Sequence, residues 1–414
     1  MVAYEALQDL IPLYPLYQLL FTDHGLSSTQ ISTLFIIWSA TAFVLEIPSG
    51  ALADLFSRRK LLMLGPALTG LGYAAWIAWP SYGAFALGFV LWGAGSALIS
   101  GTYEAFVYDE LAARGSTGKY AGLLGKARSA ALLSNLTATL LAIPLFAYGG
   151  YLLAGAVSVL SCLAQLLVAA SLPEAARVAS ADETADDLEA ADGATGGGWR
   201  GALERYLAML RAGLAEAATS PAVRKAVLLV ALLGGFLAFD EYFPLLARGV
   251  GASNALVPLL IAGTVAAQAI GGALAGPAYR LAASVFAVGL GATAGLIAWG
   301  SLSGTAAGFV PIALGYGVMQ LVIVVADARL QDTIEGPARA TVTSVSGFFA
   351  EVFAVAVYAG FALGAVWVSL PILVAGLTVP VLLTALITPT ALPPPPMKED
   401  DRTTGALPGP ADSW

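Results

Sequence analysis

Carboxyl groups placed inside long apolar segments are the residues of this sequence best suited to chemistry. In a lipid bilayer an ionisable group is costly, so each is a candidate for binding a proton or a charged ligand. Tyrosines lie near several of them, and an aromatic face can help to hold a cation. The candidates for substrate or proton binding are Asp9, Glu46, Tyr103, Glu104, Asp240, Glu241, Tyr316, Gln320, Asp327 and Glu351.

Two kinds of chemistry follow from acids in an apolar cavity. Desolvation raises the pKa of a carboxyl group, so that it can take up a proton near neutral pH and respond to a proton gradient. An ionised carboxylate can instead hold a cationic ligand, with help from Tyr and Trp faces. A third interpretation is structural, a private pair with an arginine or with backbone, and it stays open for Glu104, Asp109 and Asp327.

Asp9, Glu46 and Glu351 differ from those three acids because no base lies within a helical turn of them. The sequence therefore favours a functional role for these three. The bases nearest to other candidates, such as Arg128 and Arg329, lie toward the ends of the apolar segments. The interior of the apolar region is thus rich in acids and poor in bases.

The composition indicates a membrane protein. Of the 414 residues, 58% are hydrophobic and 11% are charged, whereas a soluble domain carries about a quarter charged residues. A cytosolic enzyme, a secreted disulfide scaffold and a nucleic-acid binder are excluded on this ground. A single cysteine, Cys162, and a single histidine, His24, rule out a disulfide framework and a Cys- or His-based metal site. Without a nucleophile or phosphate-loop constellation, we expect no enzyme activity, no cofactor and no metal.

Apolar stretches close to the 20 residues needed to cross a bilayer recur along the chain as two groups of six. The sequence therefore predicts an all-α membrane protein with twelve transmembrane helices. The predicted spans are residues 3–22, 29–55, 60–80, 83–110, 119–146, 149–172, 222–247, 254–278, 281–301, 305–331, 339–365 and 367–389.

The distribution of Lys and Arg predicts the orientation, because cytoplasmic loops carry an excess of both. With these spans, 18 of the 19 basic residues lie on one side and only Arg248 lies on the other. We therefore expect a multi-pass protein of the cell (inner or plasma) membrane, with both termini in the cytoplasm.

The gap between the two groups of spans has two parts. Its first part is acidic and rich in Ala and Gly, which is typical of a flexible linker. Its second part places Trp199, Leu203 and Leu207 on one helical face, which predicts an amphipathic helix on the membrane surface. The predicted domains are a six-helix bundle (1–172), a cytoplasmic linker with this surface helix (173–221), a second six-helix bundle (222–390) and a disordered cytoplasmic tail (391–414).

The two groups of spans echo each other in sequence. The stretch EIPSGALAD at 46–54 aligns with QAIGGALAG at 268–276, and EAFVYD at 104–109 aligns with DARLQD at 327–332. The offsets are 222 and 223 residues, and both matches fall at the same ends of corresponding spans. Duplicated halves of this kind are the design of many secondary transporters, which bind substrate between the halves.

The loop between spans two and three, GALADLFSRRK at 50–60, resembles the loop motif of the major facilitator superfamily. Gly50, Asp54, Arg58 and Arg59 match that motif, whereas Leu55 and Ser57 stand where Arg and Gly are common. The acid-then-arginine segments at 101–129 and 327–344 resemble those after spans four and ten of the family. The resemblance implies two pseudo-symmetric six-helix bundles, in an efflux-like bacterial member.

The same motif predicts a cytoplasmic gate formed by Gly50, Asp54, Arg58, Arg59, Asp109 and Arg128. A glycine permits close helix approach, and an acid at this helix end can sit beside the N-terminus of span eleven, the neighbour that the resemblance implies. The three arginines can pair with Asp109, Glu110 and Asp54, closing the cytoplasmic side until the pairs break. The alternative is that these bases only fix the topology.

The resemblance also implies that spans one, four, seven and ten line the central cavity and that Glu46 and Glu351 face each other across the halves. We therefore expect alternating-access transport of a small molecule, with proton-coupled export of apolar or cationic compounds as the first hypothesis. Span five lacks the Gly-Pro-x-x-Gly-Gly run of the family's drug antiporters, which weighs against export. A nutrient importer (proton symporter or uniporter) and a non-transporting membrane sensor are the alternatives. The expected partners are a small-molecule substrate, protons and the bilayer, without nucleic acid, for a monomeric protein.

Overall fold

The computed structural model describes residues 1–55, 57–100, 102–173, 220–333 and 338–395, together with Glu204, Leu207, Ala208 and Arg211. Across these residues the regular secondary structure is helical. The side chains of residues 47–55 and 338–341 lie outside the description. Most of the predicted surface helix at 199–218 and of the tail also lies outside it.

The N-terminal half supplies six passes, the first of them broken. Its elements are α1 (Val2–Gln8), α2 (Tyr17–Asp23), α3 (Ser28–Leu55), α4 (Arg58–Ala78), α5 (Tyr82–Ile99), α6 (Thr102–Ala113), the short 3₁₀ helix η1 (Thr117–Lys119) and α7 (Tyr120–Ser171). The long α7 contains two passes, because its backbone leaves helical geometry at Gly149 and Gly150.

The C-terminal half repeats this arrangement. Its elements are α10 (Pro221–Gly235), the 3₁₀ helix η2 (Phe236–Tyr242), α11 (Phe243–Gly249), α12 (Leu256–Ala278), α13 (Ala283–Leu302), the 3₁₀ helix η3 (Ala306–Gly308), α14 (Phe309–Thr333), α15 (Ala338–Gly364) and α16 (Leu370–Ala391).

The predicted fold class is confirmed. Ten helices of the described chain are long and apolar enough to cross a membrane. Counting the two passes of α7 separately and adding the broken pass α1–α2 gives the twelve that the sequence predicts. The chain is therefore a multi-pass, all-helical membrane protein.

Glycines make the turns between passes and the closest helix contacts. Gly150 adopts φ 58° and ψ −152°, a backbone region that is essentially restricted to glycine. A Cβ built on Gly271 of α12 would lie 2.0 Å from the carbonyl oxygen of Gly317 in α14. Small residues therefore set how closely these helices pack, as expected for helices in lipid.

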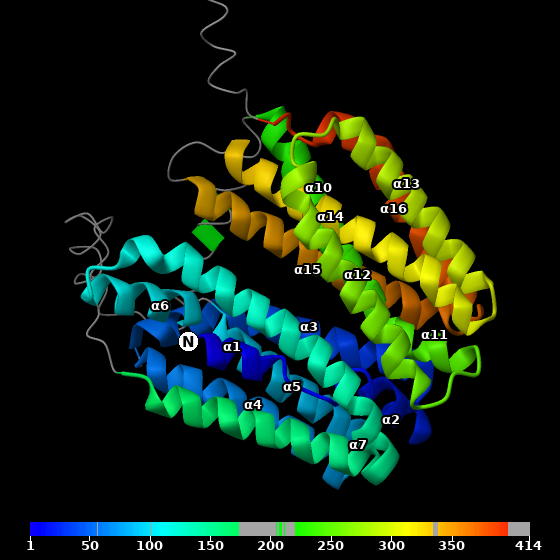
Figure 1. The fold of residues 1–414 in the computed structure, drawn as a ribbon, viewed down its shortest axis with the longest axis horizontal. Coiled ribbons are helices and arrows are strands. Elements are labelled where there is room, and N and C mark those ends of the chain that lie inside the picture. The colour runs from blue at the N-terminus through cyan, green and yellow to red at the C-terminus, as the bar shows by residue number, and fades with distance from the viewer. Residues whose placement is uncertain are drawn as a thin grey trace, which may run out of the picture.

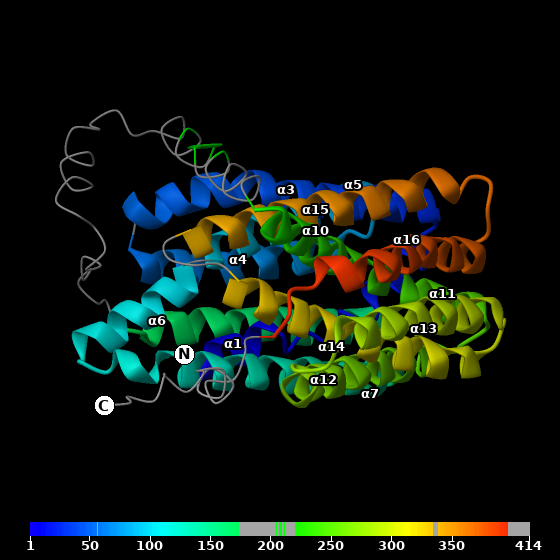
Figure 2. The same cartoon turned by 90° about the horizontal axis from the view of Figure 1, so that it is seen from above.

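The two halves lie side by side, as Figure 1 shows by the change from blue and cyan to green, yellow and red. They contact each other mainly through α3 with α15 and α7 with α12. The view from above shows that the axes of the long helices are roughly aligned with the long axis of the molecule (Figure 2). We call the end with Arg58, Arg114 and Arg280 the basic end, and the opposite end, with the turns at Gly25 and Gly150, the far end.

Two passes are irregular in the middle, one in each half. Between α1 and α2 the chain leaves the helix over residues 9–16, which include Pro12 and Pro15. Proline removes a backbone donor and cannot continue a regular helix. In the second half, α10 gives way to the 3₁₀ helix η2, which carries Asp240 and Glu241. Such breaks are typical of binding sites in transporters.

Candidate functional site

A cavity of about 350 Å³ lies between the two halves, at the level of the two broken passes. The irregular backbone at both breaks places polar side chains in its wall, where a continuous helix would present fewer. Nine of its lining residues come from the N-terminal half and eight from the C-terminal half. They are Tyr14, Pro15, Tyr17, Gln18, Trp38, Trp92, Leu132, Asn135 and Thr139, and Asp240, Glu241, Phe243, Pro244, Ile261, Thr264, Val265 and Gln268.

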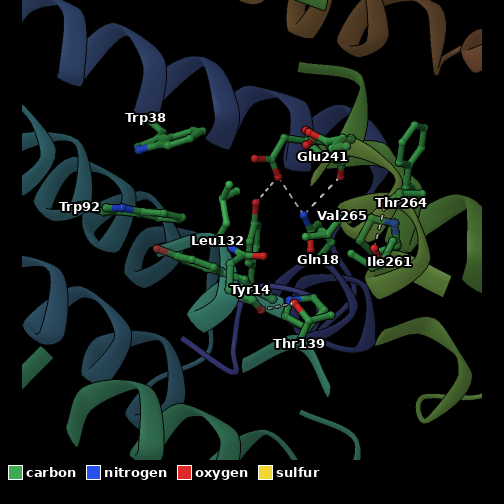
Figure 3. Close-up of a pocket in the computed structure, with 17 residues that line it drawn as sticks. Tyr14, Gln18, Trp38, Trp92, Leu132, Thr139, Glu241, Ile261, Thr264 and Val265 are labelled. Atoms are coloured by element: carbon green, nitrogen blue, oxygen red, sulfur yellow. Dashed lines mark hydrogen bonds between the residues drawn. The ribbon is translucent and has the colours of Figure 1, made fainter. Parts of the chain in front are cut away.

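Glu241 is the polar centre of this cavity (Figure 3). The Tyr17 hydroxyl donates to Glu241 Oε2, and Gln18 Nε2 donates to the same oxygen at 2.9 Å. Gln18 Nε2 also lies 3.3 Å from the backbone carbonyl of Glu241. Hydrogen bonds to a carboxylate are among the stronger ones, so this group joins α2 to η2 across the interface between the halves.

The contact between Gln18 and Glu241 joins the two halves at the centre of the cavity. The two residues are not equivalent in the repeat, because the matching turns at Gly25 and Gly251 align α2 with α11 at an offset of 226 residues, which pairs Gln18 with Pro244. The sequence analysis did not identify Gln18, because it searched for charged groups and Gln18 is uncharged.

The Gln18 side chain keeps one free polar atom. Its residue is only 2% exposed, and both contacts of Nε2 are to acceptor oxygens, which fixes the amide orientation because a carbonyl oxygen there would meet a carboxylate. Within the described chain Gln18 Oε1 has no hydrogen-bond partner. A buried acceptor without a donor is costly, so this atom is available to a ligand.

An aromatic wall stands opposite the acids. The rings of Tyr14 and Trp92 are stacked with centroids 5.4 Å apart, and Trp38 lies 4.9 Å from Trp92. In Figure 3, Trp38 and Trp92 lie on one side of the cavity and Glu241 lies on another. Stacked rings provide a flat apolar surface and a face that attracts cations.

A second cavity, of about 500 Å³, contains Glu46 and Glu351. It is lined by α3, α5 and α15, with Ser96, Ser100 and Thr343 among the polar residues. The hydroxyl of Ser39 in α3 donates to Glu351 Oε1 in α15. The structure thus brings the two acids, one from each half, to a single cavity at the α3–α15 contact.

A third cavity, of about 400 Å³, contains Asp9, Tyr103 and Glu104. Glu104 pairs with Arg128 at 3.0 Å, and Tyr103 stacks on Tyr4 with centroids 5.7 Å apart. Leu132 lines both this cavity and the central one, so the two adjoin. Glu104 has the arginine partner that the structural interpretation requires, whereas Asp9 faces the cavity.

Three candidates lie away from the cavities. Tyr316 is buried and donates to the Leu237 carbonyl at 2.7 Å, which supports the start of η2. Gln320 and Asp327 line none of the three cavities, and Asp327 is exposed. Arg329, which could have paired with Asp327, is instead buried among backbone carbonyls.

The predicted gate residues form contacts within the N-terminal half. Arg58 pairs with Asp109, and Arg59 donates to the Ala170 carbonyl at 2.5 Å, at the end of α7. Glu110 pairs with Arg114 at 2.8 Å. The side chains of Gly50 and Asp54, and the start of α15 that the gate would meet, lie outside the described part of the structure.

The far end carries an ion pair that the sequence analysis did not identify. Arg248 of α11 pairs with Asp23 of α2, and it also donates to Asn254. The Tyr151 hydroxyl donates to the other oxygen of Asp23 at 2.5 Å. The signal was present in the sequence, since Arg248 is the only base predicted on this side and needs a partner. We call Asp23, Tyr151 and Arg248 the far-end latch.

Further contacts close the far end above the central cavity. The Ser32 and Tyr242 hydroxyls lie 2.8 Å apart, and the Thr29 hydroxyl donates to the Ala362 carbonyl at 3.1 Å. Phe35 packs edge-on against Tyr242, with centroids 5.7 Å apart. Each contact joins one half to the other, so the halves meet tightly on this side.

Twelve passes in two similar halves, with a polar cavity between them, define a membrane transporter of the secondary type. The chain belongs to the major facilitator superfamily, because the family described as Major Facilitator Superfamily matches residues 7–356. No curated protein matches the chain by sequence.

Solved structures share the fold at low sequence identity. A nucleoside transporter, NupG, matches with a TM-score of 0.68 at 11% identity, covering 94% of this chain and 97% of that one. An auto-inhibited POT family peptide transporter matches with 0.67 at 14%, covering 94% and 95%. A D-xylose–proton symporter matches with 0.64 at 15%, covering 95% and 96%. At such identities the likeness establishes the fold, and the substrate must be argued from the cavity.

Proposed function

We propose that this chain is a proton-coupled antiporter that exports small apolar or cationic compounds by alternating access. The observation that carries the proposal is the position of Glu241. It lies in a cavity shared by both halves and is held by two hydrogen-bonding side chains of the other half. Protonation of this carboxylate would change its hydrogen bonds to Tyr17 and Gln18, and so would change how strongly the two halves are held together.

Competition explains why such a site would exchange substrate for protons. A cation and a proton cannot both neutralise the same carboxylate, so binding of one weakens binding of the other by linkage. When the proton gradient is directed inward, protons bind from outside and cations leave outward. Cation and proton therefore alternate at this site, and antiport results when that alternation is coupled to the movement of the halves.

Glu46 and Glu351 supply a second place where protons can act. They lie at the α3–α15 contact, one on each half, and α3 and α15 must slide or separate when the halves rock. Because both carboxylates line one cavity, their negative charges repel, and protonation of either removes that repulsion. The hydrogen bond from the Ser39 hydroxyl to Glu351 would break in this movement.

The far-end latch provides the element that opens and closes. If the basic end faces the cytoplasm, as the positive-inside rule predicts, the latch closes the outer side in the state described. Opening to the outside requires Asp23 and Arg248 to separate. Because both are about a third exposed, they can be solvated once apart, and the separation is of modest cost.

Reconstitution tests the proposal. In proteoliposomes with the protein in one orientation, an imposed pH gradient should accelerate substrate movement against the direction of proton flow. A Glu46→Gln, Glu351→Gln double variant should bind substrate but lose the acceleration. An unchanged gradient-driven rate in the double variant would remove these two acids from the coupling mechanism, and the absence of any gradient effect in the wild type would refute proton coupling.

A further inference from the structure

Resting on the proposed function, we infer that the central cavity recognises a small aromatic amine in its protonated form, with at least one N–H directed at Gln18 Oε1 and Glu241. The proposed function names cationic compounds in general, and this inference names one class of them. It separates ammonium groups that carry hydrogens from quaternary ones, which carry charge but no donor.

The sign of the charge follows from the lining. The cavity contains Asp240 and Glu241, and none of the 17 residues that line it is Lys, Arg or His. An anionic ligand would meet two carboxylates and no compensating base, which is strongly unfavourable in a site of low dielectric. A cation gains from both acids.

The need for an N–H follows from the hydrogen-bond inventory. Gln18 Oε1 is an acceptor without a donor among the described residues, in a side chain that is 2% exposed. Glu241 Oε2 already accepts two hydrogen bonds, which leaves Oε1 of the same carboxylate for a ligand. An ammonium with two or three hydrogens can donate to both free oxygens, whereas a trimethylammonium group can donate to neither.

The aromatic ring of the proposed ligand follows from the aromatic wall of the central cavity. Tyr14 stacks on Trp92, Trp38 packs against Trp92 at a tilt of 31°, and Phe243 adds a further apolar face. A flat ring gains from offset stacking on such a surface. The volume of about 350 Å³ is at the small end of the range for ligand pockets, so it suits one ring or a fused pair.

The binding test uses three probes of similar shape on the purified full chain in lipid nanodiscs. These are phenethylamine, its trimethylammonium derivative and 3-phenylpropionate. Dissociation constants are measured by calorimetry at pH 7.5. We expect phenethylamine to bind at least about tenfold more tightly than the trimethyl compound, the equivalent of one hydrogen bond to a charged group, and 3-phenylpropionate not to bind.

Two variants locate the discrimination. Gln18→Met keeps the volume of the side chain and removes the acceptor, so the preference for phenethylamine over the trimethyl compound should fall to about twofold or less. Gln165→Met is the matched control, because Gln165 is equally buried at 2% but lines none of the three cavities. It should retain the tenfold preference.

The outcomes separate this inference from the proposed function. Equal affinity of the wild type for phenethylamine and its trimethyl derivative, or no binding of phenethylamine, would overturn the inference even if another cation is exchanged for protons. Tenfold discrimination that depends on Gln18 would support it. If that discrimination is found but a pH gradient fails to drive any movement of phenethylamine, the coupling proposal fails while the recognition of an N–H-bearing ammonium stands.

Discussion

Glu241 and Arg329 are charged residues of the same half with different roles, and Glu241 is half-buried whereas Arg329 is buried. Glu241 faces a cavity, and among the described residues its side-chain hydrogen bonds are made through Oε2. Arg329 is 1% exposed and directs its guanidinium at backbone carbonyls, at 2.6 Å to Leu281 and 3.0 Å to Pro393. The first arrangement leaves a site for a ligand, and the second ties the end of α12 to the segment after α16.

A pH dependence of binding follows from the role of Glu241. A proton and a cation compete for this carboxylate, so the apparent affinity for a cationic ligand should fall as the pH is lowered through the titration of the group. In the Glu241→Gln variant the affinity should be at least about tenfold weaker at pH 7.5. Its remaining pH dependence should be smaller, and calorimetry between pH 5 and 8 measures both. A Glu241→Gln variant with full affinity and an unchanged pH profile would show that Glu241 does not hold the cation.

Replacing Arg329 should cost stability rather than ligand binding. In Arg329→Met the carbonyls of Tyr279, Leu281 and Pro393 lose their donor. The bond to Pro393 is buried and the other two are partly buried, and a buried carbonyl left unsatisfied costs about 1–3 kcal/mol. We expect a loss of at least about 2 kcal/mol in the free energy of unfolding, seen as a lower melting temperature in detergent. The exposed Arg280 gives the control, because Arg280→Met should stay within about 0.5 kcal/mol of the wild type.

At the scale of elements, the passes could be predicted from the sequence and the breaks within them could not. An apolar run of about 20 residues identifies a span whatever its partners are, so even the close pair of passes in α7 was found. The break between α1 and α2 was missed, because Pro12 and Pro15 lie in a mostly apolar run and proline is tolerated within membrane helices. The 3₁₀ geometry of η2 depends on packing, which includes the hydrogen bond from Tyr316.

The candidate site was predictable only in part, for a related reason. Acids are conspicuous in an apolar run, so Asp240 and Glu241 were named, as were Glu46 and Glu351. Which acids share a cavity depends on helix rotation and crossing, which no single segment specifies. Gln18 is uncharged and was therefore not among the predicted site residues. A buried amide must still find hydrogen-bond partners, so it also marks a candidate binding site.

The turn between the two passes of α7 allows a test of its backbone conformation. Gly150 adopts a backbone conformation essentially closed to other residues. Gly150→Ala should therefore lower the free energy of unfolding by about 1–3 kcal/mol. Gly295 of α13, where an added Cβ would meet no atom within 4 Å, should tolerate alanine or gain slightly. Equal melting temperatures for the two variants would contradict the strained turn.

At the scale of the whole molecule, the two halves are held together tightly at the far end and enclose cavities below it. The far-end latch and the Ser32–Tyr242 and Thr29–Ala362 contacts all cross between the halves. An alternating-access transporter must exchange these contacts for others at the basic end. Under the proposed mechanism, the state described is one of two that the chain must reach.

Weakening the latch should shift the balance between these states. With spin labels on cysteines introduced at the exposed positions Gln30 and Val366, in a chain whose native Cys162 is replaced, the far-end distance can be measured by pulsed electron resonance. In Arg248→Gln we expect a new population at longer distance. Arg280→Gln, at the basic end, should leave the distribution unchanged, and a single unaltered distance in Arg248→Gln would mean that the latch does not hold the halves together.

The central claim is that the chain exchanges cations for protons, with Glu241 holding the cation and with Glu46 and Glu351 coupling proton binding to the movement of the halves. The most direct test follows the proton while the substrate moves. Proteoliposomes are loaded with a cationic substrate and a trapped pH indicator, without an imposed pH gradient. As substrate leaves down its own gradient, the lumen should become more acidic in the wild type and stay unchanged in the Glu46→Gln, Glu351→Gln variant. Substrate leaving with no change of lumenal pH, or with the lumen becoming alkaline, would contradict antiport.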